Sequence, residues 1–199
     1  MTKIHSKQQL IAAAEKVFLE KGYDAARVED IGAELGVLQG SLYYHIGSKA
    51  GLLRLVLRHR FTSMTEQIEE IAASSASVRD KLRSAVIAQL SYHNDRLPDS
   101  PQWFKNPGGP KESAADIETD RKMVARFRQA WHDILADGIE RGEIRSEVDP
   151  DAASLSILGM CNYMARWYEA HAMTHEAIAD SQLELIWTGM APREIFKGD

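Results

Sequence analysis

Apolar residues recur at intervals of three and four along nearly the whole chain, which is the spacing of amphipathic α-helices. The period-two alternation of β-strands is almost absent. The first stripe begins after Ser6, which forms a predicted capping box with Gln9, and it stops at Gly22, a residue typical of helix C-termini. A second, short stripe covers residues 28–35. The pattern therefore predicts an all-α protein.

Further helices begin at polar residues that can cap a helix, and Asp149 followed by Pro150 is the strongest of these start signals. In the helix predicted from Ala114, the stripe runs through Ile117 and Val124 to a stop at Gly142. The other helices are predicted over about 48–71, 77–90, 149–172 and 174–190. Four of the six prolines and two adjacent glycines fall in residues 97–113, which predicts a long loop there. About nine helices are expected in total.

The segment between residues 37 and 49, "VLQGSLYYHIGSK", is unusually rich in aromatic and small polar side chains. Two short helices joined at Gly36 after a longer helix make a helix-turn-helix, whose second helix enters the major groove of DNA. The second helix is predicted over 38–46, with Leu42 and Ile46 facing inward. The residues left facing outward are Gln39, Gly40, Ser41, Tyr43, Tyr44 and His45.

These outward side chains suit DNA better than they suit plain solvent. A glutamine can pair with an adenine edge, a serine can serve several bases, and phenol or imidazole groups can reach phosphate oxygens. Gly40 permits close approach of the backbone to the groove. Lys49 stands at a predicted helix N-terminus, where a cation and free N–H groups together suit a phosphate. A structural turn without DNA contacts is the alternative that these residues leave open.

The distribution of charge suggests a small basic module attached to an acidic body, and chance is the alternative that it leaves open. The net charge is −5, but residues 1–60 carry nine basic and six acidic side chains, so the remainder carries fifteen against twenty-three. The single cysteine, Cys161, excludes an intrachain disulfide and favours a reducing, cytoplasmic location. Neither a signal-peptide pattern at the N-terminus nor an apolar run long enough for a membrane is present in the sequence.

The stretch "RVEDIGAELGVLQGSLYYHIGSKAGLL", residues 27–53, resembles the DNA-binding domain of the TetR family of one-component transcriptional repressors. The resemblance covers about 45 N-terminal residues densely. Two positions depart from the family pattern, because Arg27 and Leu38 stand where Ser or Thr usually caps a helix. Each loss should weaken a helix start by about 1 kcal/mol. Arg27 can instead add a phosphate contact.

The resemblance implies a homodimer that pairs through its last two helices and places two recognition helices on a palindromic DNA operator. It also implies a DNA-binding domain over residues 1–50 and a ligand-binding and dimerisation domain over residues 51–199. The sequence supports the pairing independently, because both terminal helices are apolar on more than one side. Their apolar residues include Ile157, Met160, Cys161, Met164, Trp167, Leu183, Leu185, Ile186, Trp187 and Met190.

The acidic body is expected to bind a small-molecule inducer. Its candidate contacts are Trp103, Phe127, Trp131, Tyr163, Arg166 and Trp167, with Phe104 beside the first of them. The aromatic residues can equally be ordinary core. Arg166 lies in a mostly apolar helix and needs a partner or an anion. "NYMARWYEA" and "GIERGEIRSEVDPD" resemble the CoA-thioester-responsive branch of the family, in which Arg166 would meet the nucleotide phosphates.

No spacing of nucleophile, base and acid marks a catalytic site, so we expect no enzyme activity and no cofactor. His171 and His175 are four apart, but Thr174 is a predicted cap between them, so no metal site is expected. The expected function is a homodimeric repressor that a small molecule releases from its operator. The open alternatives are an activator and an all-helical small-molecule-binding protein or enzyme.

Overall fold

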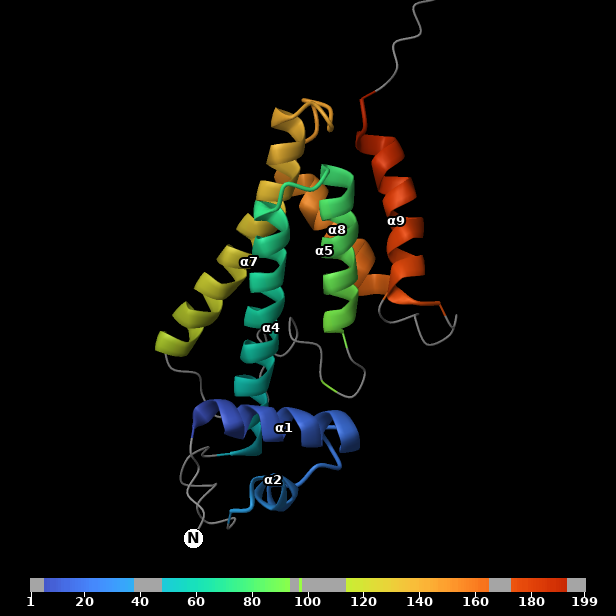
Figure 1. Cartoon of the computed structure of the whole chain (residues 1–199). Helices are drawn as coiled ribbons and strands as arrows, with labels where there is room; N and C mark the ends of the chain where they lie inside the picture. Colours follow the sequence, from blue (N-terminus) through green and yellow to red (C-terminus); the bar gives the residue numbers. More distant parts are fainter. Residues whose placement is uncertain (1–5, 38–47, 94–96, 98–113, 165–172, 193–199) are drawn as a thin grey trace, which may run out of the picture. The chain divides into compact units, whose positions relative to one another are not determined.

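The computed structural model describes residues 6–37, 48–93, 97, 114–164 and 173–192. In these residues it contains seven helices and no strand, which confirms the all-α prediction (Figure 1). They are α1 (Lys7–Lys21), α2 (Val28–Leu35), α4 (Lys49–Ala73), α5 (Val78–Tyr92), α7 (Ala114–Glu140), α8 (Pro150–Met164) and α9 (His175–Met190).

The predicted count of about nine helices is too high for the part of the chain that is described. The long apolar stripes form single uninterrupted helices, of 25 residues in α4 and 27 residues in α7. The helix predicted over 38–46 and the loop predicted over 98–113 lie outside the described residues. Within the described ranges, no helix is both long enough and apolar enough to cross a membrane.

Helix starts follow the predicted capping residues closely. The hydroxyl oxygens of Ser6, Ser48, Ser77 and Thr174 each accept a hydrogen bond from the backbone N–H three residues later, at 3.0 to 3.2 Å. Asp149 Oδ1 accepts from the N–H groups two and three residues later, at 2.9 and 3.2 Å. These bonds satisfy N–H groups that have no partner inside a helix, so the starts are encoded locally.

Helix α2 begins at Arg27 without a capping side chain, as the sequence predicts, because a guanidinium cannot accept a hydrogen bond. The opposite half of a capping box forms instead. Asp30 Oδ2 accepts from the Arg27 backbone N–H at 2.9 Å, and Asp30 also pairs with Lys21 at 2.6 Å. The pKa of Asp30 is lowered by these two bonds, the Lys21 bond first. Asp30 therefore offsets part of the expected weakness of this helix start.

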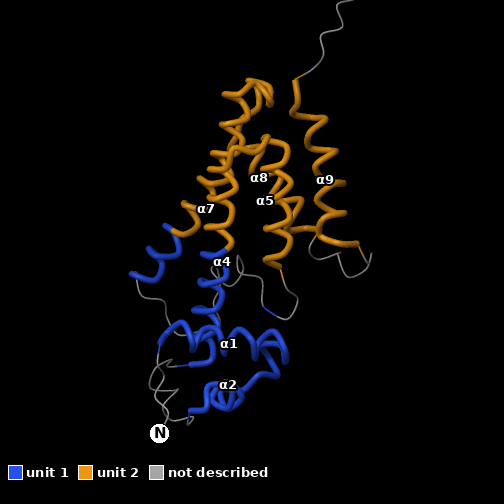
Figure 2. The backbone as a smooth tube through the Cα atoms, viewed as in Figure 1, with its two compact units in different colours: residues 1–63, 94–122 blue, residues 64–93, 123–199 orange. Residues whose placement is uncertain are grey.

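The chain divides into two compact units, which are described separately (Figure 2). Unit 1 comprises residues 1–63 and 94–122, and unit 2 comprises residues 64–93 and 123–199. The division falls inside the continuous helices α4 and α7. These units describe packing, and the predicted separation of functional domains at residue 50 stays a prediction.

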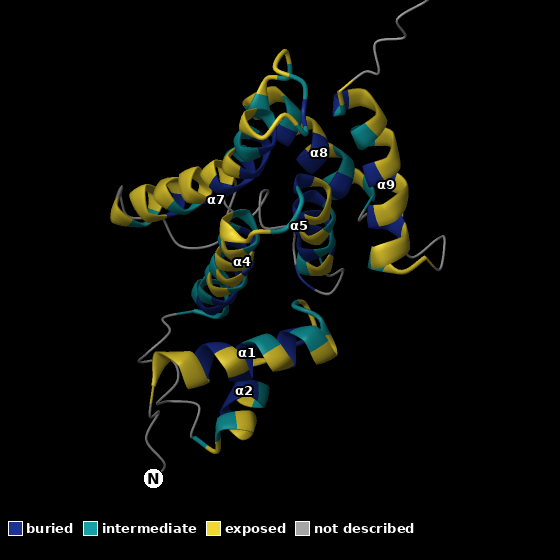
Figure 3. Cartoon of the chain, turned by 45° about the horizontal axis from the view of Figure 1, so that its top comes forward, coloured by how far each residue is buried: buried dark blue, intermediate teal, exposed yellow. Residues whose placement is uncertain are grey.

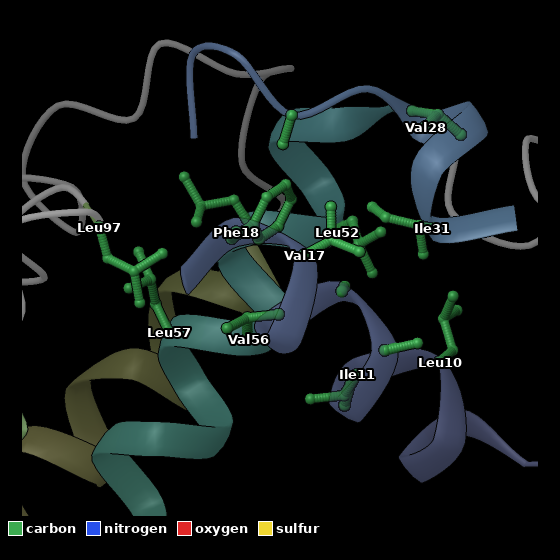
Figure 4. Packing of buried hydrophobic residues seen from close by; sticks show 14 residues of the cluster. Leu10, Ile11, Val17, Phe18, Val28, Ile31, Leu52, Val56, Leu57 and Leu97 are labelled. Carbon is green, nitrogen blue, oxygen red and sulfur yellow. The ribbon is translucent and has the colours of Figure 1, made fainter. Parts of the chain in front are cut away.

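The core of unit 1 joins α1, α2 and the first turns of α4 (Figure 4). Phe18 of α1, Ile31 of α2, and Leu52 and Val56 of α4 are fully buried in it. Apolar residues of α1, α2 and the N-terminal part of α4 face this core. The three helices therefore form one packed module.

Helix α5 is the central contact in unit 2, where α9 and α8 pack against it (Figure 1). Lys81 of α5 is only 3% exposed, and its Nζ donates to the Ala72 carbonyl and to Asp137 Oδ2 of α7, both at 2.8 Å. On the surface, Arg83 pairs with Asp180 of α9 at 2.5 Å. Apolar packing is non-directional, whereas these hydrogen bonds and ion pairs require a defined geometry between the helices.

One predicted stripe is only partly buried. In α7 the C-terminal part is buried, including Trp131, but Ile117 is 47% exposed and Val124 is also exposed (Figure 3). In the first turns of this helix, the buried Asp120 and the more exposed Asp116 both pair with Arg58 of α4. This part of α7 is therefore held by polar contacts, while Ile117 and Val124 remain exposed. The hydrophobic spacing of this helix is therefore not matched by burial at residues 117 and 124.

Candidate nucleic-acid interface and ligand-binding residues

Two of the eight residues predicted to bind DNA lie in the described part of the chain, Arg27 and Lys49. The other six, Gln39, Gly40, Ser41, Tyr43, Tyr44 and His45, lie outside the described residues.

Arg27 presents an exposed side chain at the start of α2. Two lysines of the preceding helix are already neutralised, because Lys16 pairs with Glu34 at 2.7 Å and Lys21 pairs with Asp30 at 2.6 Å. An exposed guanidinium beside a helix N-terminus is well placed to bind a phosphate in a bidentate manner. A contact of Arg27 with the DNA backbone stays a prediction.

Lys49, the first residue of α4, is held in place by the turn between α1 and α2. Its Nζ donates to the Asp24 carbonyl at 3.2 Å and lies 4.4 Å from the centroid of the Tyr23 ring. A cation at this distance over an aromatic face is attracted by the negative ring face. The ammonium therefore has a defined position, and it still has N–H groups to offer to a phosphate.

The predicted ligand-binding residues divide into three groups. Phe127 and Trp131 are buried together on α7, with ring centroids 6.5 Å apart in an edge-to-face arrangement. Tyr163 of α8 has a 61% exposed side chain in this single chain. The remaining candidates, Trp103, Arg166 and Trp167, and also Phe104, lie outside the described residues.

The indole of Trp131 contains a buried donor that needs an acceptor. Its Nε1 atom is inaccessible and has no hydrogen-bond partner among the described residues. Leaving such a group unpaired costs about 1–3 kcal/mol. A phenylalanine at this position would fill the core without burying a polar group. The buried N–H of Trp131 therefore suggests a hydrogen-bond acceptor from outside the described residues.

Two family models match the sequence. One, described as "Bacterial regulatory proteins, tetR family", matches residues 10–56, and the other, "Tetracyclin repressor-like, C-terminal domain", matches residues 75–190, more than half of the chain. The chain belongs to the TetR family. The resemblance inferred from residues 27–53 is thereby confirmed, and this TetR-family protein is a transcriptional regulator with a helix-turn-helix.

Relatives of this TetR-family regulator match it over nearly its whole length. The transcriptional repressor KstR2 of Rhodococcus jostii (strain RHA1) is 26% identical over 185 residues, which cover 92% of this chain and 90% of that protein. The regulator PfmR of Thermus thermophilus has a TM-score of 0.67 at 27% identity, covering 90% of this chain and 97% of PfmR. FadR of Bacillus subtilis, solved in complex with stearoyl-CoA, shares the fold with a TM-score of 0.67 at 22% identity, covering 92% of this chain and 99% of FadR.

Sequence reasoning missed a set of buried amides in the body of this TetR-family regulator. Gln89 of α5 donates from Nε2 to Asn162 Oδ1 of α8 at 3.1 Å, and His93 Nε2 contacts the same oxygen at 3.0 Å. Gln89 Oε1 and Gln182 Nε2 of α9 have no partner among the described residues. The available signal was the position of Gln89 on the buried face that the stripe of residues 78–90 defines.

Cys161 of α8 lies beside Gln182, and its thiol is buried. Burial raises the pKa of its thiol to about 12, and its Sγ donates to Gln182 Oε1 at 3.5 Å. Only the thiolate is a strong nucleophile, so the thiol form is unreactive at neutral pH. In the part of the chain that is described, no three His, Cys, Asp or Glu side chains gather as metal ligands would.

Proposed function

We propose that this TetR-family regulator is a homodimeric repressor that a small-molecule effector releases from a palindromic operator. The observation that carries the proposal is the similarity over nine-tenths of both chains to a protein named as a transcriptional repressor. The helix-turn-helix scaffold of α1, α2 and α4 supplies the framework for operator binding. Effector binding would shift the population between dimer geometries with different spacings of the two recognition helices.

The operator contacts are proposed residue by residue. Arg27 and Lys49 would bind phosphates at the starts of α2 and α4. Base edges and neighbouring phosphates would be met by Gln39, Gly40, Ser41, Tyr43, Tyr44 and His45. Gly36, whose φ of 66° closes α2 in the left-handed conformation, supports the turn that precedes these residues. The DNA-binding domain is proposed to end near residue 50.

The effector is proposed to bind in residues 51–199, against Phe127 and Trp131. The Trp131 N–H, which has no partner among the described residues, and the buried Gln89 amide would bind its polar groups. A CoA thioester is the proposed class, because FadR, which has the same fold, was solved with stearoyl-CoA. In this assignment Arg166 would bind the nucleotide phosphates, while Trp103, Tyr163 and Trp167 would complete the apolar contacts.

The dimer is proposed to form through α8 and α9. Leu155 and Tyr163 on α8 and Leu185 on α9 are large apolar or aromatic side chains that the single chain leaves exposed, Leu185 to 71%. Exposed apolar surface of this kind on the two terminal helices is typical of a protein interface. We further propose that the regulator acts in the cytoplasm, beside its DNA, and has no catalytic activity.

Selection of bound duplexes from a random pool tests operator binding. We expect one palindrome to be enriched, with affinity falling as salt rises at a log–log slope of about −0.9 per phosphate neutralised. Enrichment of no sequence from the pool would contradict the proposal.

Effector release is then tested on the selected duplex with octanoyl-CoA, stearoyl-CoA, free stearate and CoA alone. We expect an acyl-CoA, but neither stearate nor CoA, to release the protein. Arg166→Ala should retain operator affinity and lose this release. Tighter DNA binding with acyl-CoA, or release by stearate, would reject the assigned class of effector.

A further inference from the structure

We propose that Tyr23 is a positioning residue for operator binding, which acts by holding the Lys49 ammonium and through it the start of α4. This inference rests on the proposed operator binding, and it concerns a residue outside the predicted contact set. Tyr23 lies in the turn between α1 and α2, and Lys49 is the first residue of α4. The pair thus joins two points that are distant along the chain.

The Tyr23 ring is anchored in the core of unit 1. It packs edge-to-face on Phe18, with ring centroids 5.5 Å apart, and Phe18 is fully buried. The turn around it is short and hydrogen-bonded, because Gly22 N–H donates to the Phe18 carbonyl at 2.9 Å and Ala26 N–H donates to the Gly22 carbonyl at 3.1 Å. The face of the Tyr23 ring is therefore a fixed surface.

Lys49 meets this surface and the neighbouring backbone together. Its Nζ lies 4.4 Å from the Tyr23 ring centroid and 3.2 Å from the Asp24 carbonyl oxygen. Both contacts favour a cation, since a ring face and a carbonyl oxygen are negative. The long, flexible lysine side chain is thereby ordered before DNA binds. Less side-chain conformational entropy is then lost on binding.

The position of the contact in the chain explains why it should matter to DNA. The bond from Lys49 to Asp24 joins residues 25 apart and closes a loop that contains α2 and the whole predicted contact set from Gln39 to His45. The contact therefore connects the start of α4 with the turn that precedes α2. Losing the Tyr23 ring should thus misplace the start of α4 while leaving every cation of the module present.

Operator affinity of Tyr23→Leu, Tyr23→Phe and the wild type tests the proposal on the duplex selected from the random pool. Leucine keeps an apolar contact for Phe18 but has no ring face, so we expect affinity to fall about three- to tenfold. Tyr23→Phe keeps the ring face and should stay within about twofold. The slope of affinity against salt should be the same in all three proteins, since no phosphate contact is removed.

A double-mutant cycle with Lys49→Met separates positioning through Lys49 from a general loss of stability. If Tyr23 acts through Lys49, Tyr23→Leu should have no further effect on affinity in the Lys49→Met background. Affinities are measured well below the thermal midpoint of every variant, so that lost stability alone leaves them unchanged.

Three results would overturn the inference while operator binding stands. They are wild-type affinity in Tyr23→Leu, an equal loss in Tyr23→Phe, and additive losses in the double variant. A wild-type protein that selects no duplex would instead reject the proposed function, and the inference with it.

Discussion

Asp120 of α7 accepts a hydrogen bond from Arg58 Nε of α4 at 2.6 Å, and the two side chains are only 11% and 16% exposed. The same guanidinium donates to Asp116 Oδ1 at 2.9 Å and to the Asp116 carbonyl at 3.0 Å. Arg58 thus attaches the first two turns of α7 to α4 inside unit 1. An arginine suits this task because its planar group can serve several acceptors in fixed directions.

Replacing Asp120 by Asn should lower the free energy of unfolding by about 1–3 kcal/mol, because the guanidinium is left largely buried with one carboxylate fewer. Asp116→Asn is the control, and it should cost less because Asp116 is more exposed and its carbonyl bond remains. Urea denaturation of the three proteins at pH 7 measures the differences. Equal stability of Asp120→Asn and the wild type would show that the pair contributes nothing.

The Lys81–Asp137 pair should make stability depend on pH. Hydrogen bonds from Lys81, and then from Arg141, lower the pKa of Asp137 in spite of its partial burial. Because the folded-state pKa lies below the unfolded-state value, the stabilisation is complete above the unfolded-state value and is lost as the pH falls below about 5. Asp137→Asn should cost about 1–3 kcal/mol at pH 7.

The measurement is urea denaturation of the wild type and Asp137→Asn from pH 7 down to pH 3. The difference between them should shrink as the pH falls. The matched control is Asp133→Asn, an exposed aspartate of the same helix. A difference that stays constant over this range, or grows toward low pH, would contradict the assignment.

Gly138 lets α7 approach the start of α5 closely. A Cβ at this position would lie 2.7 Å from Ile144 Cδ1 and 2.8 Å from Val78 Cγ1. Gly138→Ala gains about 1 kcal/mol of helix propensity but overpacks this contact by about 1–3 kcal/mol, so we expect a net loss of stability.

Thermal unfolding of Gly138→Ala, Ile144→Val and the double variant measures this overpacking. Because Ile144→Val removes the methyl group in closest contact, the double variant should be more stable than the sum of the two single changes predicts. Strict additivity would show that the methyl groups do not clash.

Leu185→Glu should convert the proposed dimer into monomers, because it replaces the exposed leucine of α9 in the proposed interface with a charge. Ile117→Glu on α7 is the matched control, since it is also an exposed apolar residue but lies outside the proposed interface. Light scattering after size-exclusion chromatography gives the mass of each. Monomers in both variants, or dimers in both, would argue against pairing through this face.

The helix starts and the protein family could both be predicted from the sequence. Ser6, Ser77 and Thr174 cap helices as predicted, because a capping bond joins residues three apart and depends little on the rest of the fold. The family was likewise readable from a contiguous stretch, residues 27–53. The contact residues from Gln39 to His45 remain predictions.

The sequence by itself determined where the described helices begin and which short segment is proposed to meet DNA, because both depend on neighbours a few residues away. Only the tertiary structure decided that Lys49 contacts Tyr23 and that Ile117 faces solvent. Each of these depends on how one helix is rotated against another, and hydrophobic spacing along one helix leaves that rotation undetermined when two faces can compete for burial.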